Sequence, residues 1–364
     1  MKKKVLILEC PVTTGGTGHE VAALSIKEAL KAVDKNINAL CACPVKKTRT
    51  AKRISSAYSK LINYAPNVFG FLHESKMVAD MANYLRNRFG DYKQYRRLIS
   101  SFKPDVVACT HAYPCWAVSS IKEKEQLQVP LIGVVTDFHM HHYWPLNNVD
   151  KYVVATKEAK NELMQRGINK DKVKDLGIPI HPKFSGKNSK LKIKKRLGLG
   201  NKPTILVMGG GLGIGSMERA VKLLDSMDDI QLIVVCGKNN KLKDKLLKSK
   251  FKNKLIVKGY VTNMDELMDV SDIAVTKAGG LTVSECLAKN LPMVVVNPIP
   301  GQEQRNTDYL VKYNAAVKPK SEKYLIPAVE KLLNKKNEPG KIAKPNSAID
   351  IAKLIVNIPK NSKS

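Results

Sequence analysis

The chain has 364 residues, of which 43% are hydrophobic and 26% are charged. At about 100 to 200 residues per domain, this length predicts two globular domains, and the composition excludes a disordered chain and a multi-span membrane protein. Lysine and arginine number 62 against 32 acidic residues, which leaves a net charge of +30. So large a positive excess predicts a polyanionic partner, either nucleic acid or anionic lipid.

No apolar run approaches the roughly 18 residues that span a bilayer. The run at 5–8 follows three lysines, as in a signal peptide, but it soon meets Gly15 and Gly16 without a cleavage pattern. We therefore interpret it as a buried first strand. The seven cysteines include no C-x-x-C pair, so neither a zinc site nor a disulfide framework is predicted, and a reducing cytosol fits best.

Short apolar runs alternate with helical patterns, and the alternation starts again after a turn-rich stretch at 179–201. This pattern predicts βαβ units and parallel sheets covered by helices. We expect strands at 5–8, 106–109, 131–135, 152–155, 204–208, 232–236, 255–258, 273–276 and 293–297. We expect helices at 21–33, 117–125 and 157–166, between the glycines at 209–211 and residue 224, and at 349–358.

The expected fold class is therefore α/β, with two Rossmann-like, doubly wound domains facing each other across a cleft. The first domain should comprise 1–180 and be followed by a linker at 181–201. The second should comprise 202–345, and 346–364 should form a closing helix and tail. Ligands of such sheets bind beyond the carboxyl ends of the strands.

The segment 46–97 interrupts this alternation. It carries twelve basic residues against three acidic ones. Aromatic residues are interleaved with them: Tyr58, Tyr64, Phe69, Phe71, Tyr84, Phe89, Tyr92 and Tyr95. A basic, aromatic helical segment suits the interface of an anionic membrane. An ordinary helical insertion with a solvated face has the same composition, and composition alone does not decide between the two.

A glycine-rich turn with Gly16 and Gly18 follows the first strand and opens a helix at His19. Backbone amides at such a helix start attract anions, although close packing alone also explains glycines there. The turn has neither the Gly-Lys-Ser/Thr of a Walker loop nor the G-x-G-x-x-G spacing of dinucleotide sites. His19 is a candidate acid or base because imidazole exchanges a proton near neutral pH, but a lone histidine is more often structural.

Two stretches of the second half carry a stronger pattern. Residues 276–285 read as a strand end, a bare glycine turn and a new helix, which is the geometry of a phosphate site. Glu285, one turn into that helix, is placed to accept hydrogen bonds from both hydroxyls of a ribose. After the next strand, Glu303 and Gln304 offer a carboxylate and an amide to sugar hydroxyls. Because the two stretches follow adjacent strands, we interpret them as one binding site.

Taken together, these residues resemble the two-domain glycosyltransferases called GT-B. The sequence is most similar to the diacylglycerol glycosyltransferases of glycosyltransferase family 28, namely monogalactosyldiacylglycerol synthase and the processive diacylglycerol glucosyltransferase. The resemblance covers nearly the whole chain and rests on 15–19, 135–138 with His141 and Trp144, 177–180, 208–211, 276–285 and 301–306. The Thr136-Asp137 segment with His141 and Trp144 points to the diacylglycerol enzymes specifically.

The resemblance implies an inverting hexosyltransferase that moves glucose or galactose from a UDP-sugar to 1,2-diacylglycerol, once or processively. His19 is the implied general base, and Asp137 is the second candidate. Implied contacts to substrate are Gly16, Gly18, Gly210, Gly211, Gly259, Val261, Gly279, Gly280, Thr282, Glu285, Glu303 and Gln304. Among them, uracil lies near 259–261, the phosphates at 279–282, the ribose at Glu285 and the hexose at 303–304. The insertion 46–97 would hold the enzyme on the cytoplasmic face of the cell membrane as a peripheral, monotopic protein.

The chemistry of an inverting transfer agrees with these roles. A base takes the proton of the acceptor hydroxyl, and amides at helix starts stabilise the leaving diphosphate. The chain contains no D-x-D motif, so we predict that it needs neither a metal nor another cofactor. The expected partners are UDP-glucose or UDP-galactose, diacylglycerol and an anionic membrane surface.

Three other functions remain open at this point. The same fold transfers N-acetylglucosamine from its UDP-sugar to an undecaprenyl-linked peptidoglycan precursor, and fold relatives epimerise UDP-sugars. Binding of nucleic acid would also explain the charge of +30, but no recognised nucleic-acid module is present, so no nucleic-acid partner is expected.

Overall fold

The structure is a computed structural model that describes residues 2–10, 18–44, 68, 70, 72, 75–89, 92–144, 147–209, 217–335 and 337–359. Much of the predicted membrane insertion at 46–97 lies outside these residues. The chain forms two compact units. The first comprises Met1–Pro182, Ile299–Gln302 and Asn346–Ser364, and the second comprises Lys183–Pro298 and Glu303–Pro345.

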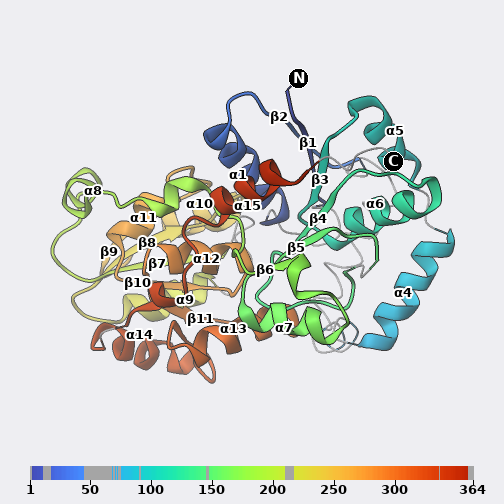
Figure 1. Cartoon of the computed structure of the whole chain (residues 1–364). Coiled ribbons are helices and arrows are strands. Elements are labelled where there is room, and N and C mark those ends of the chain that lie inside the picture. The colour runs from blue at the N-terminus through green and yellow to red at the C-terminus, as the bar shows by residue number, and fades with distance from the viewer. Residues whose placement is uncertain are drawn as a thin grey trace. The chain divides into compact units, whose positions relative to one another are not determined.

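Each unit contains a six-stranded parallel sheet covered by helices, so the predicted α/β class is confirmed (Figure 1). In the first unit the strand order is β2-β1-β3-β4-β5-β6. The strands are β1 (Lys4–Leu8), β2 (Asn38–Ala42), β3 (Val106–Cys109), β4 (Leu131–Val134), β5 (Lys151–Val153) and β6 (Val173–Lys174). The helices are α1 (Gly18–Val33), α4 (Lys76–Phe89), α5 (Lys93–Phe102), α6 (Ala112–Glu125), α7 (Lys157–Gln165), the 3-10 turn η1 (Lys170–Lys172) and α15 (Ser347–Asn357).

Both faces of the first sheet are buried, because alternate side chains of each strand point to opposite faces. Val5 and Ile7 of β1 pack with α1 and α15. Leu6 and Leu8 of the same strand pack with α5, α6 and α7. Double burial explains why these strands read in the sequence as short continuous apolar runs.

Helix α15 returns to the first unit after the chain has completed the second sheet. Ser347 at its start donates its hydroxyl to the Ile178 carbonyl at 2.7 Å. At its other end, Lys3 Nζ donates to the carbonyl oxygens of Val356 at 2.7 Å and Ile358 at 2.9 Å. The first unit is therefore assembled from both ends of the described chain.

The described part of the 46–97 segment divides into two helices with different environments. Tyr92 and Tyr95 are buried in the core beside α6, Tyr95 almost completely. These two aromatic residues are therefore part of the core of the first unit, as in an ordinary helical insertion. In contrast, α4 exposes Met77, Met81 and Tyr84 to solvent.

The second unit repeats the architecture with the strand order β12-β11-β10-β7-β8-β9. The strands are β7 (Thr204–Met208), β8 (Gln231–Val235), β9 (Lys254–Lys258), β10 (Ile273–Thr276), β11 (Met293–Val295) and β12 (Ala316–Val317). The helices are α8 (Lys190–Leu197), α9 (Met217–Asp225), α10 (Asn240–Lys248), α11 (Met264–Val270), α12 (Gly280–Ala288), α13 (Gln302–Lys312) and α14 (Leu325–Leu333). Short 3-10 turns are η2 (Pro182–Ser185), η3 (Glu322–Tyr324) and η4 (Pro339–Ile342). One face of this sheet forms a core with α9, α10 and α14.

Candidate active site

The candidate residues of the first unit lie where the strand order of its sheet reverses, between β1 and β3. Loops leaving neighbouring strands at such a point run in opposite directions and open a crevice at the carboxyl edge. Thr110 follows β3 and Thr136 follows β4, while His19 stands in the first turn of α1. The topology therefore brings together three side chains that are far apart in the sequence.

His19 is fixed by two of these neighbours. Its Nδ1 lies 2.8 Å from the Thr110 carbonyl oxygen and 2.9 Å from the Thr136 hydroxyl oxygen. The Thr110 hydroxyl in turn donates to the His19 carbonyl at 3.0 Å. A carbonyl oxygen can only accept, so the proton of the neutral ring sits on Nδ1. Nε2 consequently keeps its lone pair, which is the arrangement a general base needs.

The surroundings keep this imidazole neutral. Burial lowers the pKa of His19, and the negative charge of Asp137 and the hydrogen bond to the Thr110 carbonyl oppose that effect without cancelling it. The ring of His111 lies edge-on to that of His19, with 4.7 Å between the ring centroids. At neutral pH His19 is therefore a free base with a carboxylate nearby to stabilise its protonated form.

Asp137 is held from a distant part of the chain. Gln302, at the start of α13, donates Nε2 to Asp137 Oδ1 at 2.6 Å. The loop after Asp137 is fixed at Met140, where Glu162 Oε2 accepts from the backbone N–H at 2.8 Å and Arg166 donates to the carbonyl at 2.8 Å. Sequence reasoning included Gln302 in the 301–306 stretch but did not link it to Asp137, and it missed Glu162 and Arg166, because no local pattern connects them to Asp137.

The candidate residues of the second unit lie around the start of α12, beside the reversal of strand order between β10 and β7. Gly279 is the N-cap, and no side chain caps the helix or places an acidic group in its first turn. A Cβ at Gly279 would meet nothing within 4 Å. The first amides of α12 and the helix dipole are groups that attract anions, so the structure is compatible with the phosphate site expected here.

Helix α13 is tied to this turn. The buried Asn306 side chain donates to the Ala278 carbonyl at 2.9 Å. The bond brings Glu303 and Gln304, in the first turn of α13, to the same edge of the sheet as Gly279 and Gly280. The Gln304 amide is engaged on both sides, because Nε2 donates to Asp308 and Oε1 accepts from Lys318, each at 2.6 Å.

Glu285 lies in α12, in the turn after Gly280 and Thr282. Burial raises the pKa of its carboxyl group to about 8, the charge of Lys183 works against this, and that of Asp265 adds to it. Gly259 and Val261 follow β9 at the same sheet edge, and Tyr260 between them is 62% exposed. The expected donor-binding positions in the described chain therefore all follow carboxyl ends of the second sheet.

Gly16, Gly210 and Gly211, which were also expected to contact substrate, lie outside the described residues. Gly18, the first residue of α1, has open space where a Cβ would stand. Within the described ranges, no three His, Cys, Asp or Glu residues are grouped so that they could hold a metal ion. No described helix is long and apolar enough to cross a membrane.

Two family models match the chain, one in each half. Residues 19–180 match the model of monogalactosyldiacylglycerol (MGDG) synthase, and residues 204–356 match the glycosyltransferase family 28 C-terminal domain. The first range includes His19 and Asp137, and the second includes Gly279, Glu285 and Glu303.

Relatives and solved structures agree with these models. The chain is 35% identical, over 72% of its length and 66% of the relative, to a processive diacylglycerol beta-glucosyltransferase of Bacillus cereus. The chain is also 33% identical to the processive diacylglycerol beta-glucosyltransferase of Bacillus cytotoxicus, over 78% of this chain and 74% of the relative. The chain thus spans just under two thirds of the first of these relatives.

Solved structures share the fold at low identity. Acinetobacter baumannii MurG gives a TM-score of 0.58 at 15% identity, covering 98% of this chain and 100% of that one. The UDP-GlcNAc 2-epimerase of Neisseria meningitidis, bound to UDP-GlcNAc, gives 0.60 at 15% identity with the same coverage. These likenesses show the two-sheet GT-B fold. The chain belongs to the family of monogalactosyldiacylglycerol synthases and processive diacylglycerol glucosyltransferases, within glycosyltransferase family 28.

Proposed function

We propose that the protein transfers a hexose from a UDP-sugar to the free hydroxyl of 1,2-diacylglycerol and so makes a membrane glycolipid. The observation that carries this proposal is the 33% identity to a processive diacylglycerol beta-glucosyltransferase over 78% of the chain. The family model on the first unit and the nucleotide-type site on the second support it. Because both relatives are processive glucosyltransferases by name, we propose glucose as the hexose and repeated transfer to the product.

In the proposed reaction His19 is the general base. Its Nε2 takes the proton of the acceptor hydroxyl while that oxygen forms a bond to the anomeric carbon of the sugar. Asp137 stabilises the imidazolium that results, since its charge already favours protonation of His19. The Nδ1 hydrogen bond to the Thr110 carbonyl keeps the ring in the one tautomer that can act.

The leaving group departs from the opposite side of the sugar. The bond between the anomeric carbon and the diphosphate oxygen breaks, and its electron pair goes to UDP. Amides at the start of α12 are already oriented toward an anion, so they stabilise the growing charge without rearrangement. A single displacement of this kind inverts the configuration at the anomeric carbon.

Transfer by the purified full chain tests this function. Vesicles that contain diacylglycerol are incubated with labelled UDP-glucose or UDP-galactose, and lipids are identified by mass spectrometry. We expect labelled glucosyldiacylglycerol and further glucosylated products, and about 10² to 10⁴ times slower formation with His19→Ala. Transfer only to an undecaprenyl-linked peptidoglycan precursor, or conversion of the UDP-sugar to its epimer, would overturn the proposal.

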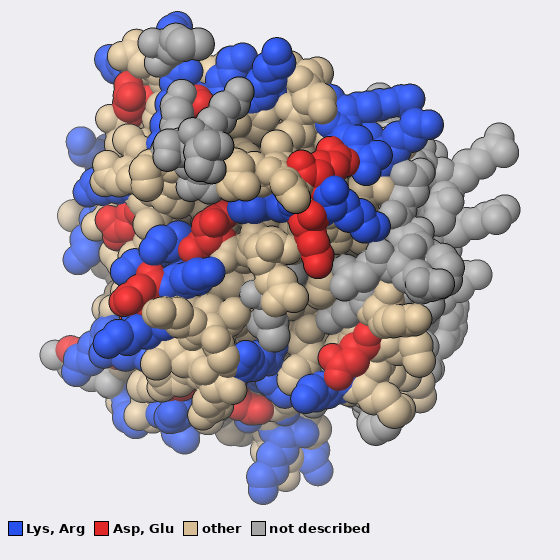
Figure 2. All heavy atoms as spheres, turned by 45° about the vertical axis from the view of Figure 1, so that its right-hand side comes forward, with Lys and Arg blue, Asp and Glu red and all other residues tan. Residues whose placement is uncertain are grey.

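We also propose that α4 binds the membrane surface. Met77, Met81 and Tyr84 recur at helical spacing, so they share a face, and they are 76%, 59% and 60% exposed. In Figure 1 α4 lies at the outside of the first unit. Figure 2 shows Lys and Arg side chains across the face drawn, with acidic side chains scattered between them. An apolar stripe on a strongly basic protein suits insertion among anionic headgroups.

Flotation with anionic vesicles tests this contact. Met77→Glu/Met81→Glu should weaken vesicle binding by about tenfold or more, because each exposed methionine contributes about 1.5 kcal/mol or more when buried. Leu247→Glu on α10 is the matched control, since Leu247 is equally exposed at 59% but lies in the second unit. Equal losses in both variants would show that α4 has no special role.

A further inference from the structure

His111 lies between Thr110, whose carbonyl fixes His19, and the first residue of α6. It is the N-cap of that helix. Its backbone is extended, and its Nδ1 accepts the backbone N–H of Tyr113 at 3.0 Å. Because a backbone N–H can only donate, Nδ1 of His111 holds a lone pair. The neutral His111 ring therefore carries its proton on Nε2.

His19 and His111 are thus held in opposite tautomers. The Thr110 carbonyl places the proton of His19 on Nδ1 and leaves the lone pair on Nε2. The Tyr113 N–H does the reverse in His111. The two rings are nearly perpendicular, at 85°, with their centroids 4.7 Å apart. Both residues are half-buried, so neither is sealed in the core. A hydrogen-bond acceptor and a hydrogen-bond donor are therefore neighbours at this edge of the sheet.

An alcohol hydroxyl is the group that matches such a pair. It donates one hydrogen bond through its proton and accepts others through its oxygen. An oxygen that makes a hydrogen bond of about 2.8 Å to each of two nitrogens bridges up to about 5.6 Å. The 4.7 Å between the two ring centroids is within this span. An ester or phosphate oxygen can only accept, so it would satisfy His111 but not His19.

We propose that His111 is a second acceptor-binding residue: its Nε2–H donates to the oxygen of the acceptor hydroxyl while His19 Nε2 takes the proton of the same hydroxyl. The proposal rests on the proposed function, because it takes His19 as the general base. The two bonds leave the remaining lone pair of that oxygen for the anomeric carbon, so His111 orients the nucleophile. Neutral His111 has no lone pair on Nε2 and does not compete for the proton.

Two substitutions separate this role from capping of α6. His111→Asn keeps a capping acceptor, because asparagine is among the best N-caps, but it has no donor at the position of Nε2. His111→Gln places an amide N–H near that position, but glutamine is not among the residues that favour an N-cap. A residue that only capped α6 would need the first substitution to be harmless and the second to be damaging.

We expect the opposite pattern in activity. His111→Asn should lower kcat/KM for diacylglycerol about tenfold, the value of one lost hydrogen bond, with an unchanged melting temperature. His111→Gln should keep most of kcat/KM, although its melting temperature falls by about 2 to 4 °C because the cap is lost. The KM for UDP-glucose should stay at the wild-type value in both variants, since the proposed donor contacts belong to the second unit.

The experiment measures initial rates of glucose transfer by the purified full chain, with phosphatidylglycerol vesicles that contain diacylglycerol, and melting temperatures by circular dichroism. Asn169→Ala is the matched control. Asn169 caps η1 as His111 caps α6, because its side chain accepts the N–H two residues further on, that of Asp171, at 2.9 Å. Loss of this cap in the same unit should leave kcat/KM unchanged.

The outcomes separate the two levels of the argument. Absence of transfer by wild type would overturn the proposed function. Transfer by wild type with His111→Asn equally active would overturn the role of His111 alone. A loss in His111→Asn as large as in His19→Ala, about 10² or more, would also overturn it, because His111 would then be the base. Where His111→Asn does not fold, His111→Gln decides by itself: activity near wild type is expected, and a loss of about tenfold would refute the proposal.

Discussion

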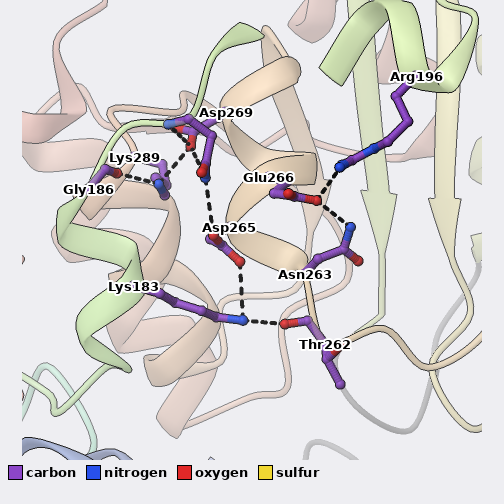
Figure 3. Close-up of polar contacts among 10 residues, drawn as sticks. Lys183, Gly186, Arg196, Thr262, Asn263, Asp265, Glu266, Asp269 and Lys289 are labelled. Carbon is purple, nitrogen blue, oxygen red and sulfur yellow. Dashed lines mark hydrogen bonds and ion pairs between the residues drawn. The ribbon is translucent and has the colours of Figure 1, made fainter. Parts of the chain in front are cut away.

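Lys289→Met is expected to destabilise the second unit strongly. Lys289 Nζ lies 2.7 Å from Asp269 Oδ2 (Figure 3), and the two side chains are only 1% and 9% exposed. Asp269 Oδ2 also accepts from the backbone N–H of Asn188 at 2.9 Å and from its Nδ2 at 2.8 Å. The variant leaves a buried carboxylate with neutral donors only, and loss of one partner of a buried pair costs about 3 to 5 kcal/mol. Because the Asn188 bonds remain, we expect the lower limit, about 3 kcal/mol.

The measurement is urea unfolding followed by circular dichroism, with calorimetry of the two units. A loss of about 3 kcal/mol lowers the melting temperature of a unit of this size by about 6 to 12 °C. The control is Lys190→Met, which removes a pair whose side chains are 43% and 34% exposed. Such an exposed pair contributes about 0 to 1 kcal/mol to stability, so the melting temperature of the control variant should change little.

The double variant Lys289→Met/Asp269→Leu sharpens the test. If the penalty of the single variant comes from an unpaired buried charge, removing the second charge should recover most of the stability. Equal losses in Lys289→Met and Lys190→Met would refute the reasoning. So would a double variant as unstable as the single one.

His19→Ala should lower turnover by about 10² to 10⁴ with UDP affinity unchanged; normal turnover would move the base to Asp137. Because burial keeps the pKa of His19 below 6.5, the acidic limb of kcat/KM should lie below pH 6.5. In Asp137→Asn, the acidic limb of the residual kcat/KM should lie at a still lower pH, because the charge of Asp137 raises the pKa of His19. A shift of the limb to higher pH would mean that another group causes it. EDTA should leave activity unchanged, and a loss restored by magnesium would contradict metal independence.

Part of the fold could be predicted from single apolar runs. The strands at 106–109, 204–208 and 273–276 match β3, β7 and β10 residue for residue, because all their side chains are buried and the runs are continuous. Strand β2 was missed. It is an edge strand whose residues are exposed or half-buried, so its apolar pattern is weak.

The site was predictable only as far as local pattern reaches. The positions of His19 in the first turn of α1 and of Glu285 one turn into α12 could be expected from the glycine turns before them. The tautomer of His19 could not, because it depends on Thr110 and Thr136, which the sheet topology brings to it. Likewise, composition placed Tyr95 and Tyr84 in one set, whereas three-dimensional packing buries the first and exposes the second.

The return of α15 to the first unit has a consequence for biosynthesis. Ile351 and Ile355 complete the hydrophobic core that α1 begins, so that core lacks one wall until residue 357 has emerged from the ribosome. While the second sheet is being synthesised, the part of the first sheet's apolar face that α15 later covers stays exposed. A nascent chain of this kind gives chaperones a long interval in which to bind. A chain truncated before α15 should therefore aggregate even where its second unit still binds nucleotide.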